Sequence, residues 1–249
     1  MNGTAAGTPE QVAVVTGGSG GIGQVVSNRL AADGMAVAVG YHGDPTAAEQ
    51  VAGSINAAGG RAITLVGDVA DADEMSAAFD RVETELGGVD VVVHTAGVMR
   101  LARLLELDLD VLDGMYRVNV RGAFVVNQQA ARRVRDGGAI VNFSSSVTRL
   151  RFPTYSGYAA SKAAVETLTS ILAREMRGRD VTVNAVAPGP TATPLFLDGK
   201  DQQDIDDLAK APPPERLGTP DDIAEVVSFL AGPARWVHGQ TVYVNGGII

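Results

Sequence analysis

The sequence predicts an α/β fold in which one parallel sheet is covered by helices on both faces, the doubly wound arrangement. Segments with the patterns of strands and helices alternate along the chain and are joined by short connections, as is typical of this class. The strand-like segments are continuous apolar runs, for example at residues 89–95, and such runs indicate parallel strands buried on both faces. Because no change in composition marks a boundary, we expect one domain of about seven strands at residues 11–249, preceded by a disordered tail at residues 1–10.

The first half of the chain is expected to hold three strand–helix units and a fourth strand. Apolar, β-rich runs place the strands at residues 11–16, 35–41, 62–66 and 89–95. Helical spacing of apolar residues places the helices between them, at residues 21–33, 45–58 and 72–86. Glycine follows each helix, at positions 34, 59 and 87, and glycine commonly ends helices because it adopts left-handed φ angles without steric cost.

The second half continues the alternation. Helices are expected at residues 109–135, at residues 154–177 and from Pro220 through residues 223–230. Strands are expected at residues 139–144, 181–186 and 241–244. Residues 188–214 lack clear periodicity and contain several prolines around a charged middle, so a long loop is predicted there.

Composition excludes several classes of function. The net charge of −9 argues against a nucleic-acid partner, which would require a basic face. The chain has no cysteine, so disulfides, thiolate nucleophiles and thiolate metal sites are excluded, and no metal site is expected. No run of 18 apolar residues and no apolar leader is present, so we expect a cytoplasmic protein without a membrane partner.

A glycine-rich turn at residues 16–23 lies between the first strand and the first helix. Backbone N–H groups in such a turn can approach a pyrophosphate at the positive end of the helix dipole. A glycine-rich match alone is weak evidence, but this is the position that a dinucleotide-binding Rossmann domain requires. The absence of a Gly-Lys-Ser/Thr sequence excludes a P-loop.

The same turn also fits the nucleophile elbow of a serine hydrolase, with Ser19 as the nucleophile. Only one strand precedes Ser19, so no upstream loop is available to build an oxyanion hole. The hydrolase is therefore the less favoured interpretation.

Tyr158 and Lys162 lie four residues apart in an expected helix, so their side chains share one face. An ammonium near a phenol favours the phenolate and lowers the phenol's pKa. Acid–base work near neutral pH would require a shift of about 3 units from the ordinary value of about 10, or about 4 kcal/mol. By itself the pair is also compatible with a solvated helix face.

Taken with the glycine-rich turn, these residues make the chain resemble the classical short-chain dehydrogenase/reductases over nearly all of residues 10–249. The family's catalytic serine stands thirteen residues before the tyrosine, which is the place of Ser145. Further matches occur in chain order, at Asn119 in Arg-Val-Asn-Val, at Pro188-Gly189 with Thr191 and Thr193, at residues 216–220 and at residues 244–247.

The resemblance implies hydride transfer between NADP(H) and a small-molecule carbonyl or secondary alcohol. Tyr158 would give or take the proton, and Lys162 would lower the tyrosine's pKa and hold the nicotinamide ribose. Ser145 would donate a hydrogen bond to the substrate oxygen, and Asn119 would position a water of the proton relay. The implied cofactor-binding residues are Gly17, Ser19, Gly20, Gly21, Ile22, Gly23, Tyr41, His42, Asp68, Val69, Thr95, Ala96, Gly97, Tyr158, Lys162, Pro188, Gly189, Thr191 and Thr193.

The end of the second strand bears on the choice of cofactor. An acid there would bond the ribose 2′-hydroxyl of NAD and repel the 2′-phosphate of NADP. Tyr41 occupies that place and His42 follows it, so the sequence favours NADP(H), with NAD as the alternative. Asp44 and the lack of an arginine at Gly20 count against this preference.

Two segments depart from the family pattern. His94 and Thr95 stand where the family's Asn-Asn-Ala-Gly segment has its two asparagines, and we expect His94 to stabilise the sheet because it lies within a strand. Asn245 replaces a common aspartate, and we expect this change to be tolerated near the surface.

The resemblance also indicates where the substrate binds and what it is. The substrate loops are expected at residues 98–105, 147–156 and 188–214, where Arg100, Arg103, Arg149 and Arg151 either meet an anionic substrate or form solvated surface. A 3-oxoacyl group on an acyl carrier is one candidate, because Arg179 matches one docking position of such reductases, although Asp136 occupies the other docking position.

Relatives form homodimers or homotetramers by pairing their long helices, which correspond here to residues 109–135 and 165–176. A catalytically inactive, cofactor-binding regulator is the alternative function.

Overall fold

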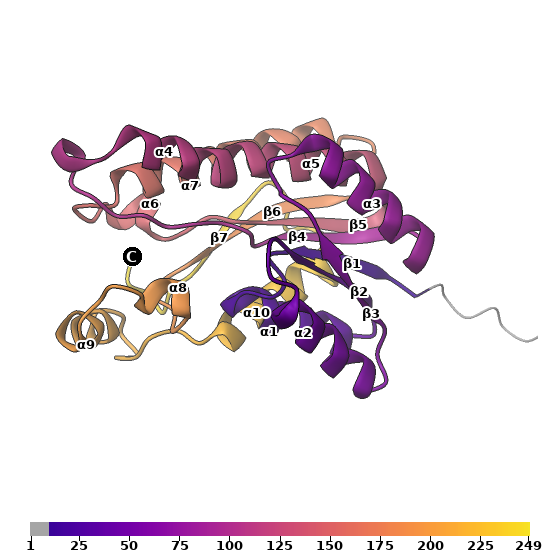
Figure 1. Ribbon diagram of the computed structural model, residues 1–249, viewed down its shortest axis with the longest axis horizontal. Helices are drawn as coiled ribbons and strands as arrows, with labels where there is room; N and C mark the ends of the chain where they lie inside the picture. Colours follow the sequence, from indigo (N-terminus) through magenta and orange to yellow (C-terminus); the bar gives the residue numbers. More distant parts are fainter. Residues whose placement is uncertain (1–9) are drawn as a thin grey trace, which may run out of the picture.

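The computed structural model describes residues 10–249, so the expected tail lies outside the described residues except for Glu10. Seven strands form one parallel sheet in the order β3-β2-β1-β4-β5-β6-β7 (Figure 1). They are β1 (Val12–Thr16), β2 (Ala36–Tyr41), β3 (Ala62–Val66), β4 (Val89–His94), β5 (Val134–Phe143), β6 (Thr182–Pro188) and β7 (Thr241–Val244). The predicted doubly wound fold is confirmed.

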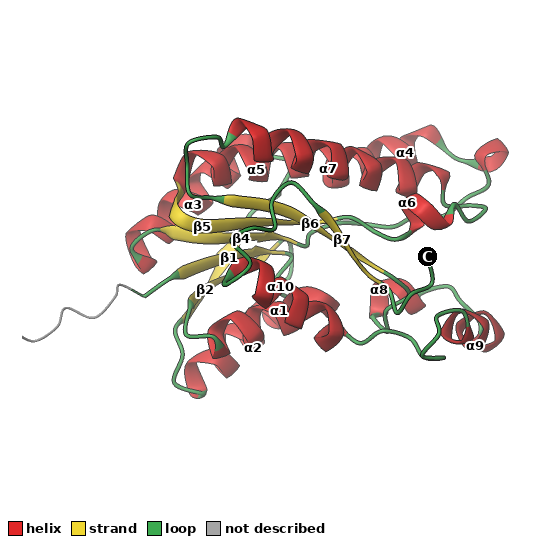
Figure 2. Ribbon diagram, turned by 180° about the vertical axis from the view of Figure 1, so that it is seen from behind, coloured by secondary structure: helices red, strands yellow, loops and turns green. Residues whose placement is uncertain are grey.

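Helices cover both faces of the sheet (Figures 1 and 2). One face carries α1 (Gly21–Ala32), α2 (Thr46–Ala57) and α10 (Pro220–Ala231); the other carries α3 (Ala72–Leu86), α4 (Leu109–Tyr116), α5 (Gly122–Arg133) and α7 (Ser156–Glu175). Val12 and Val14 of β1 pack into the core on the α3 side, and Ala13 and Val15 pack into the core on the α1 side. Successive side chains of a strand point to opposite faces, which explains why the strands are apolar throughout.

Local signals account for the ends of several helices. The Asp71 side chain accepts hydrogen bonds from the backbone N–H groups of Asp73 and Glu74, and so caps the start of α3. Gly87 ends the same helix with φ of 95°, in the left-handed region. Thr219 and Asp222 form a capping box at the start of α10.

Two predictions for the second half of the chain are wrong in detail. The expected helix at residues 109–135 is divided by a π-helical segment, η2 (Arg117–Arg121), and ends at Arg133, where β5 begins directly. The expected loop at residues 188–214 contains two helices, α8 (Pro194–Leu197) and α9 (Gln202–Lys210), capped by the side chains of Thr193 and Asp201. A 3-10 turn, η1 (Leu104–Glu106), and a short helix, α6 (Val147–Leu150), also lie in segments expected to be loops.

Within residues 10–249, none of the helices combines the length and the apolar character that crossing a membrane would demand.

Candidate active site

Two adjoining cavities lie at the carboxyl edge of the sheet, which is where ligands bind in this architecture. The first cavity follows the ends of β1, β2, β3 and β4, and the second lies beside α7. Including the space open to solvent, the first has a volume of about 1270 Å³ and the second about 850 Å³. They share lining residues, including Ile22, Gly97 and Thr193. We call them the cofactor cavity and the substrate cavity.

The glycine-rich turn forms a close-fitting end of the cofactor cavity. A Cβ atom at Gly23 would collide with the Gly17 carbonyl oxygen, and one at Gly17, whose φ is 68°, would lie 2.8 Å from the Ala96 nitrogen. No side chain caps the start of α1, where Gly20 is the N-cap. The first N–H groups of α1 are therefore available to an anionic group, as a pyrophosphate requires. This cradle fits a dinucleotide.

Every residue expected to bind the cofactor lines one of the two cavities. Thirteen of them line the cofactor cavity, namely Gly17, Ser19, Gly20, Gly21, Ile22, Gly23, Tyr41, His42, Asp68, Val69, Thr95, Ala96 and Gly97. Tyr158, Lys162, Pro188, Gly189 and Thr191 line the substrate cavity, and Thr193 lines both. Leu195 lies in the expected substrate loop at residues 188–214, and Val118 lies next to Asn119. Sequence reasoning missed Met75 and Phe143, whose apolar side chains give no motif.

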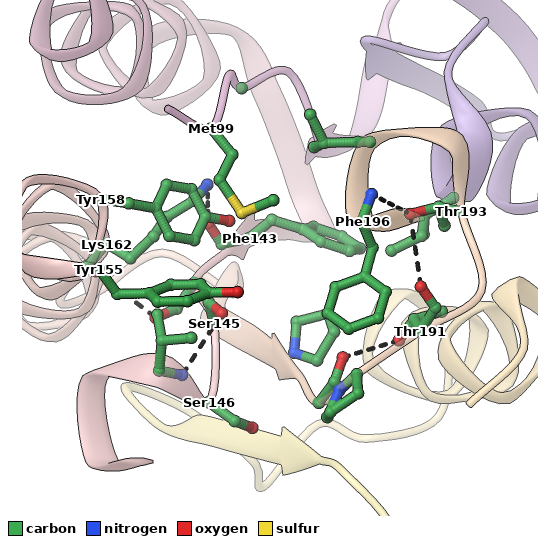
Figure 3. A pocket seen from close by; sticks show the side chains of 18 of the residues that line it. Met99, Phe143, Ser145, Ser146, Tyr155, Tyr158, Lys162, Thr191, Thr193 and Phe196 are labelled. Atoms are coloured by element: carbon green, nitrogen blue, oxygen red, sulfur yellow. Dashed lines mark hydrogen bonds between the residues drawn. The ribbon is translucent and has the colours of Figure 1, made fainter. Parts of the chain in front are cut away.

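Three of the four expected catalytic residues face the substrate cavity. Tyr158 and Ser145 lie on the same side of it, opposite Phe196 and Thr193 (Figure 3). Lys162, one turn after Tyr158 on α7, donates a hydrogen bond from Nζ to the Phe143 carbonyl at 2.9 Å, and its Nζ lies 5.8 Å from the centre of the Tyr158 ring. The arrangement places a phenol and a hydroxyl side by side, with an ammonium behind them.

Burial has the largest effect on the pKa values of Tyr158 and Lys162. It raises the pKa of Tyr158 to about 12, while a hydrogen bond with Ser145 acts in the opposite direction. Burial also lowers the pKa of Lys162 to about 8. Desolvation of the phenolate is therefore the largest influence on the tyrosine's pKa, and the expected lowering of that pKa by Lys162 stays a prediction. Tyr158 keeps its proton at pH 7, when Lys162 is still largely cationic.

Asn119 lies in the π-helical segment η2 and is buried behind the cavity wall. Its Oδ1 accepts a hydrogen bond from the Val98 N–H at 2.8 Å, and its Nδ2 donates to the Val98 carbonyl at 2.8 Å and to Ser161 Oγ at 3.1 Å. The side chain thus ties the loop after β4 to α7. Its expected role in positioning water stays a prediction.

Comparison with known proteins agrees with this geometry. Residues 17–249 match a family model described as enoyl-(acyl carrier protein) reductase. A short-chain type dehydrogenase/reductase of Picea abies is 42% identical, covering 95% of this chain and 92% of that protein.

The chain belongs to the short-chain dehydrogenase/reductase family.

Other relatives in this family are also similar along their whole length. An NADPH-dependent aldehyde reductase-like chloroplastic protein of Arabidopsis thaliana is 37% identical, covering 96% of this chain and 94% of that protein. The structure of a short-chain dehydrogenase from Burkholderia cenocepacia in complex with NADP superposes with a TM-score of 0.89 at 39% identity, covering 96% of this chain and 97% of that one. The protein is therefore an NAD(P)-dependent oxidoreductase, as the sequence predicts.

The competing hydrolase interpretation finds no support in the structure. Ser19 lines the cofactor cavity, and within residues 10–249 no hydrogen bond joins its hydroxyl to a histidine or a carboxylate. His94 and His238 are engaged elsewhere, with Thr16 and with the backbone of Ala173 and Val183. A serine nucleophile needs an adjacent base, and Ser19 has none in contact.

The two departures from the family pattern have structural explanations. His94 is buried at the end of β4, and its Nδ1 lies 2.7 Å from Thr16 Oγ1 on the neighbouring strand, β1. This cross-strand contact agrees with the expected stabilising role. Asn245 Nδ2 donates to Ser146 Oγ at 3.1 Å, and Ser146 Oγ in turn donates to the Ala187 carbonyl. The half-buried asparagine therefore links the C-terminal segment to the loop that carries Ser145.

Replacing His94 by asparagine is expected to make stability less sensitive to acid. Burial, assisted by the nearby Lys162 charge, lowers the pKa of His94 from 6.5 to about 3. Below pH 6.5 the unfolded chain takes up a proton that the folded protein does not, so stability falls as the pH falls. Between pH 7 and pH 5 the wild type should lose about 2 kcal/mol through this group, and the variant should not.

Urea unfolding at the two pH values measures the difference. His42→Asn, at an exposed position, is the control and should retain the wild-type dependence. Equal losses in His94→Asn and the wild type would contradict the account.

Proposed function

We propose that the protein is an NADPH-dependent carbonyl reductase in which Tyr158 gives the proton to the substrate oxygen. The observation that carries this proposal is the position of Tyr158 and Ser145, which face the substrate cavity, and this cavity adjoins the cofactor cavity. The raised pKa of Tyr158 suits reduction, because that direction begins with a protonated phenol. Oxidation of an alcohol would require the phenolate at the start.

NADPH supplies the hydride when it is bound. The hydroxyls of Tyr158 and Ser145 both donate to the carbonyl oxygen, where negative charge develops. Tyr158 then transfers its proton to that oxygen as a general acid. The Lys162 ammonium, cationic below about pH 8, favours the phenolate that remains and is itself oriented by the Phe143 carbonyl. An inactive regulator would have no use for this arrangement.

A direct test follows NADPH consumption with a panel of aldehydes and ketones at pH 7. The proposal expects at least one carbonyl compound to be reduced with alcohol formed in equal amount. NADPH binding without turnover of any compound would favour the regulator instead.

The structure supports NADPH over NADH at the end of β2. Tyr41 and His42 line the cofactor cavity there. The Asp44 carboxylate, which counted against this choice, accepts hydrogen bonds from the Thr46 N–H at 2.9 Å and from Thr46 Oγ1 at 2.7 Å. These bonds hold the carboxylate at the start of α2, and Asp44 is not among the residues that line the cofactor cavity.

Tyr41→Asp is expected to reverse the preference between the cofactors. A carboxylate at the end of β2 would bond the ribose 2′-hydroxyl of NADH and repel the 2′-phosphate of NADPH. The ratio of kcat/KM for NADPH to that for NADH should fall by about 100-fold, since two close like charges cost about 3 kcal/mol. Tyr41→Phe is the matched control. An unchanged ratio in Tyr41→Asp would contradict the assignment of this end of the cavity.

We also propose that the protein is a cytoplasmic homodimer or homotetramer that pairs α5 and α7 with a second copy. Phe124 of α5 and Ile171 of α7 are about half exposed, at 49% and 50%. Apolar side chains of this size are stabilised when a partner covers them. Analytical ultracentrifugation at micromolar concentration should detect the assembly, and a monomer there would contradict it.

A further inference from the structure

Aromatic and aliphatic side chains form two facing walls of the substrate cavity. The first wall contains Phe152 and Tyr155, whose ring centres are 5.9 Å apart. The second wall comes from the segment that follows β6 and contains Leu195 and Phe196 of α8 and Leu208 of α9. Figure 3 shows the Phe196 ring across the cavity from Tyr155 and Tyr158. The space between the walls suits a flat apolar group, because rings stack favourably in offset or edge-on contacts.

The cavity offers almost no charge to a substrate. Lys162 is the only charged side chain among the residues that line it. Arg149 donates from Nε to the Tyr243 hydroxyl at 2.9 Å. Arg103 and Arg151 line a neighbouring surface groove, on the other side of Phe152 and Tyr155, and do not line the cavity itself. An anionic substrate placed between the walls would lose its hydration without gaining a counter-charge, and that loss is costly.

Tyr155 adds a third hydroxyl to the two that the mechanism uses. It precedes α7, and its hydroxyl points into the cavity beside those of Tyr158 and Ser145 (Figure 3). No hydrogen bond to a side chain or to the backbone of residues 10–249 occupies it. Burial raises its pKa, with the Asp204 charge acting in the same direction, so it is a neutral hydrogen-bond donor at pH 7.

We propose that the substrate is an uncharged ketone or aldehyde that carries a flat aromatic group, and that the Tyr155 hydroxyl bonds a second oxygen of the substrate. This inference rests on the proposed carbonyl reductase. It differs from the acyl-carrier substrate considered from the sequence, for which the expected docking residue Arg179 forms an exposed ion pair with Asp136 at 2.8 Å.

The charge preference is tested with two ketones of nearly the same shape, methyl para-acetylbenzoate and para-acetylbenzoate, with NADPH at pH 7. The neutral ester should have a kcat/KM about 100-fold higher, since an unpaired charge in a cavity costs about 3 kcal/mol. Comparable values for the two, or better reduction of an acetoacetyl thioester, would overturn the inference while leaving the carbonyl reductase intact. Failure of every carbonyl compound would instead overturn the proposed function.

The role of Tyr155 is tested with benzil, which has two adjacent carbonyl groups, and deoxybenzoin, which has one. Tyr155→Phe should lower kcat/KM for benzil about 10-fold, the value of one hydrogen bond, and leave deoxybenzoin within about twofold. Tyr243→Phe is the control, since its hydroxyl is bonded to Arg149. Equal losses for both ketones would show that Tyr155 acts only on the structure of the cavity.

A second inference comes from Glu166, which lies one turn after Lys162 on α7. One oxygen of its carboxylate, Oε1, accepts hydrogen bonds from Ser144 Oγ at 2.7 Å and from Thr148 Oγ1 at 2.8 Å. These two hydroxyls flank Ser145 in the chain, so the carboxylate fixes the loop on both sides of it. Glu166 does not line either cavity.

We infer that Glu166 is a positioning residue that sets the orientation of Ser145. Glu166→Ala should lower kcat about 10-fold, in proportion to the hydrogen bonds lost, without changing the affinity for NADPH. Glu166→Gln keeps an oxygen that can accept both bonds, although as a neutral acceptor it binds them more weakly, and should recover part of the rate. Glu175→Ala, at the exposed end of α7, is the control. The assignment would be overturned if kcat in Glu166→Ala stayed within twofold of the wild type. It would also be overturned if the affinity for NADPH fell by the same factor as kcat.

Discussion

Replacing Tyr158 by phenylalanine is expected to lower kcat for carbonyl reduction by about 1000-fold, within the range that a positioned general acid contributes. The change removes one hydroxyl and keeps the aromatic ring at this position of α7. Of the other groups that face the substrate cavity, Ser145 is a much weaker acid than a phenol and Lys162 is directed at the Phe143 carbonyl. The second phenol, Tyr155, is the one we propose to bond another oxygen of the substrate. The wild-type phenol, with its pKa raised to about 12, holds its proton until charge develops on the substrate oxygen.

The affinity for NADPH should be nearly unchanged in Tyr158→Phe, and fluorescence titration measures it. Steady-state NADPH consumption gives the rate. A variant that kept more than a few per cent of the wild-type kcat would show that the proton comes from another group.

Replacing Gly23 by alanine is expected to lower the affinity for NADPH by about 100-fold or more, so that binding is no longer detected. The reason is that the glycine allows the helix and the strand to approach closely, and alanine does not. The added Cβ would collide with the Gly17 carbonyl oxygen and lie 2.8 Å from Thr95 Oγ1. Both neighbours belong to the turn and the loop that enclose the cofactor cavity, so the turn must shift. Unfolding free energy should also fall by about 3 kcal/mol, at the upper end of the usual cost of overpacking.

Gly53→Ala is the matched control for that substitution. Gly53 lies within α2 and has no atom within 4 Å of an added Cβ. Alanine there should leave NADPH binding unchanged and stabilise the helix by about 1 kcal/mol. Isothermal titration and urea unfolding measure both quantities. Wild-type NADPH affinity in Gly23→Ala would mean that the turn does not hold the cofactor.

Much of the fold could be predicted because local signals and burial agree. The bounds of β3, α3 and β7 are those expected, at residues 62–66, 72–86 and 241–244. In α3 the Asp71 cap and the Gly87 stop are both visible in the sequence. Parallel strands end at one edge of a sheet, so placing the strands also placed the residues expected to bind the cofactor around common cavities.

The remaining features depend on contacts between distant parts of the chain. The π-helical segment at residues 117–121 is set by packing and by the bonds of Asn119 to Val98 and Ser161. The four-residue helix α8 is too short to show a helical period. In α9 the apolar residues Ile205, Leu208 and Ala209 do have helical spacing, so this helix could have been predicted from the sequence. The pKa of Tyr158 depends on its burial, which no spacing reveals. Glu166 likewise stands one turn from Lys162 without any motif to connect it to Ser145.

The central claim is that the chain reduces a carbonyl group with NADPH and does not act as a hydrolase. Methyl para-acetylbenzoate tests this in one measurement, because it carries both a ketone and an ester. Chromatography of the reaction at pH 7 should find the ester of the secondary alcohol, formed only with NADPH and in an amount equal to the NADPH consumed. Release of para-acetylbenzoate without cofactor would contradict the account, as would NADPH left unconsumed with this ketone and with every other aldehyde and ketone of the panel.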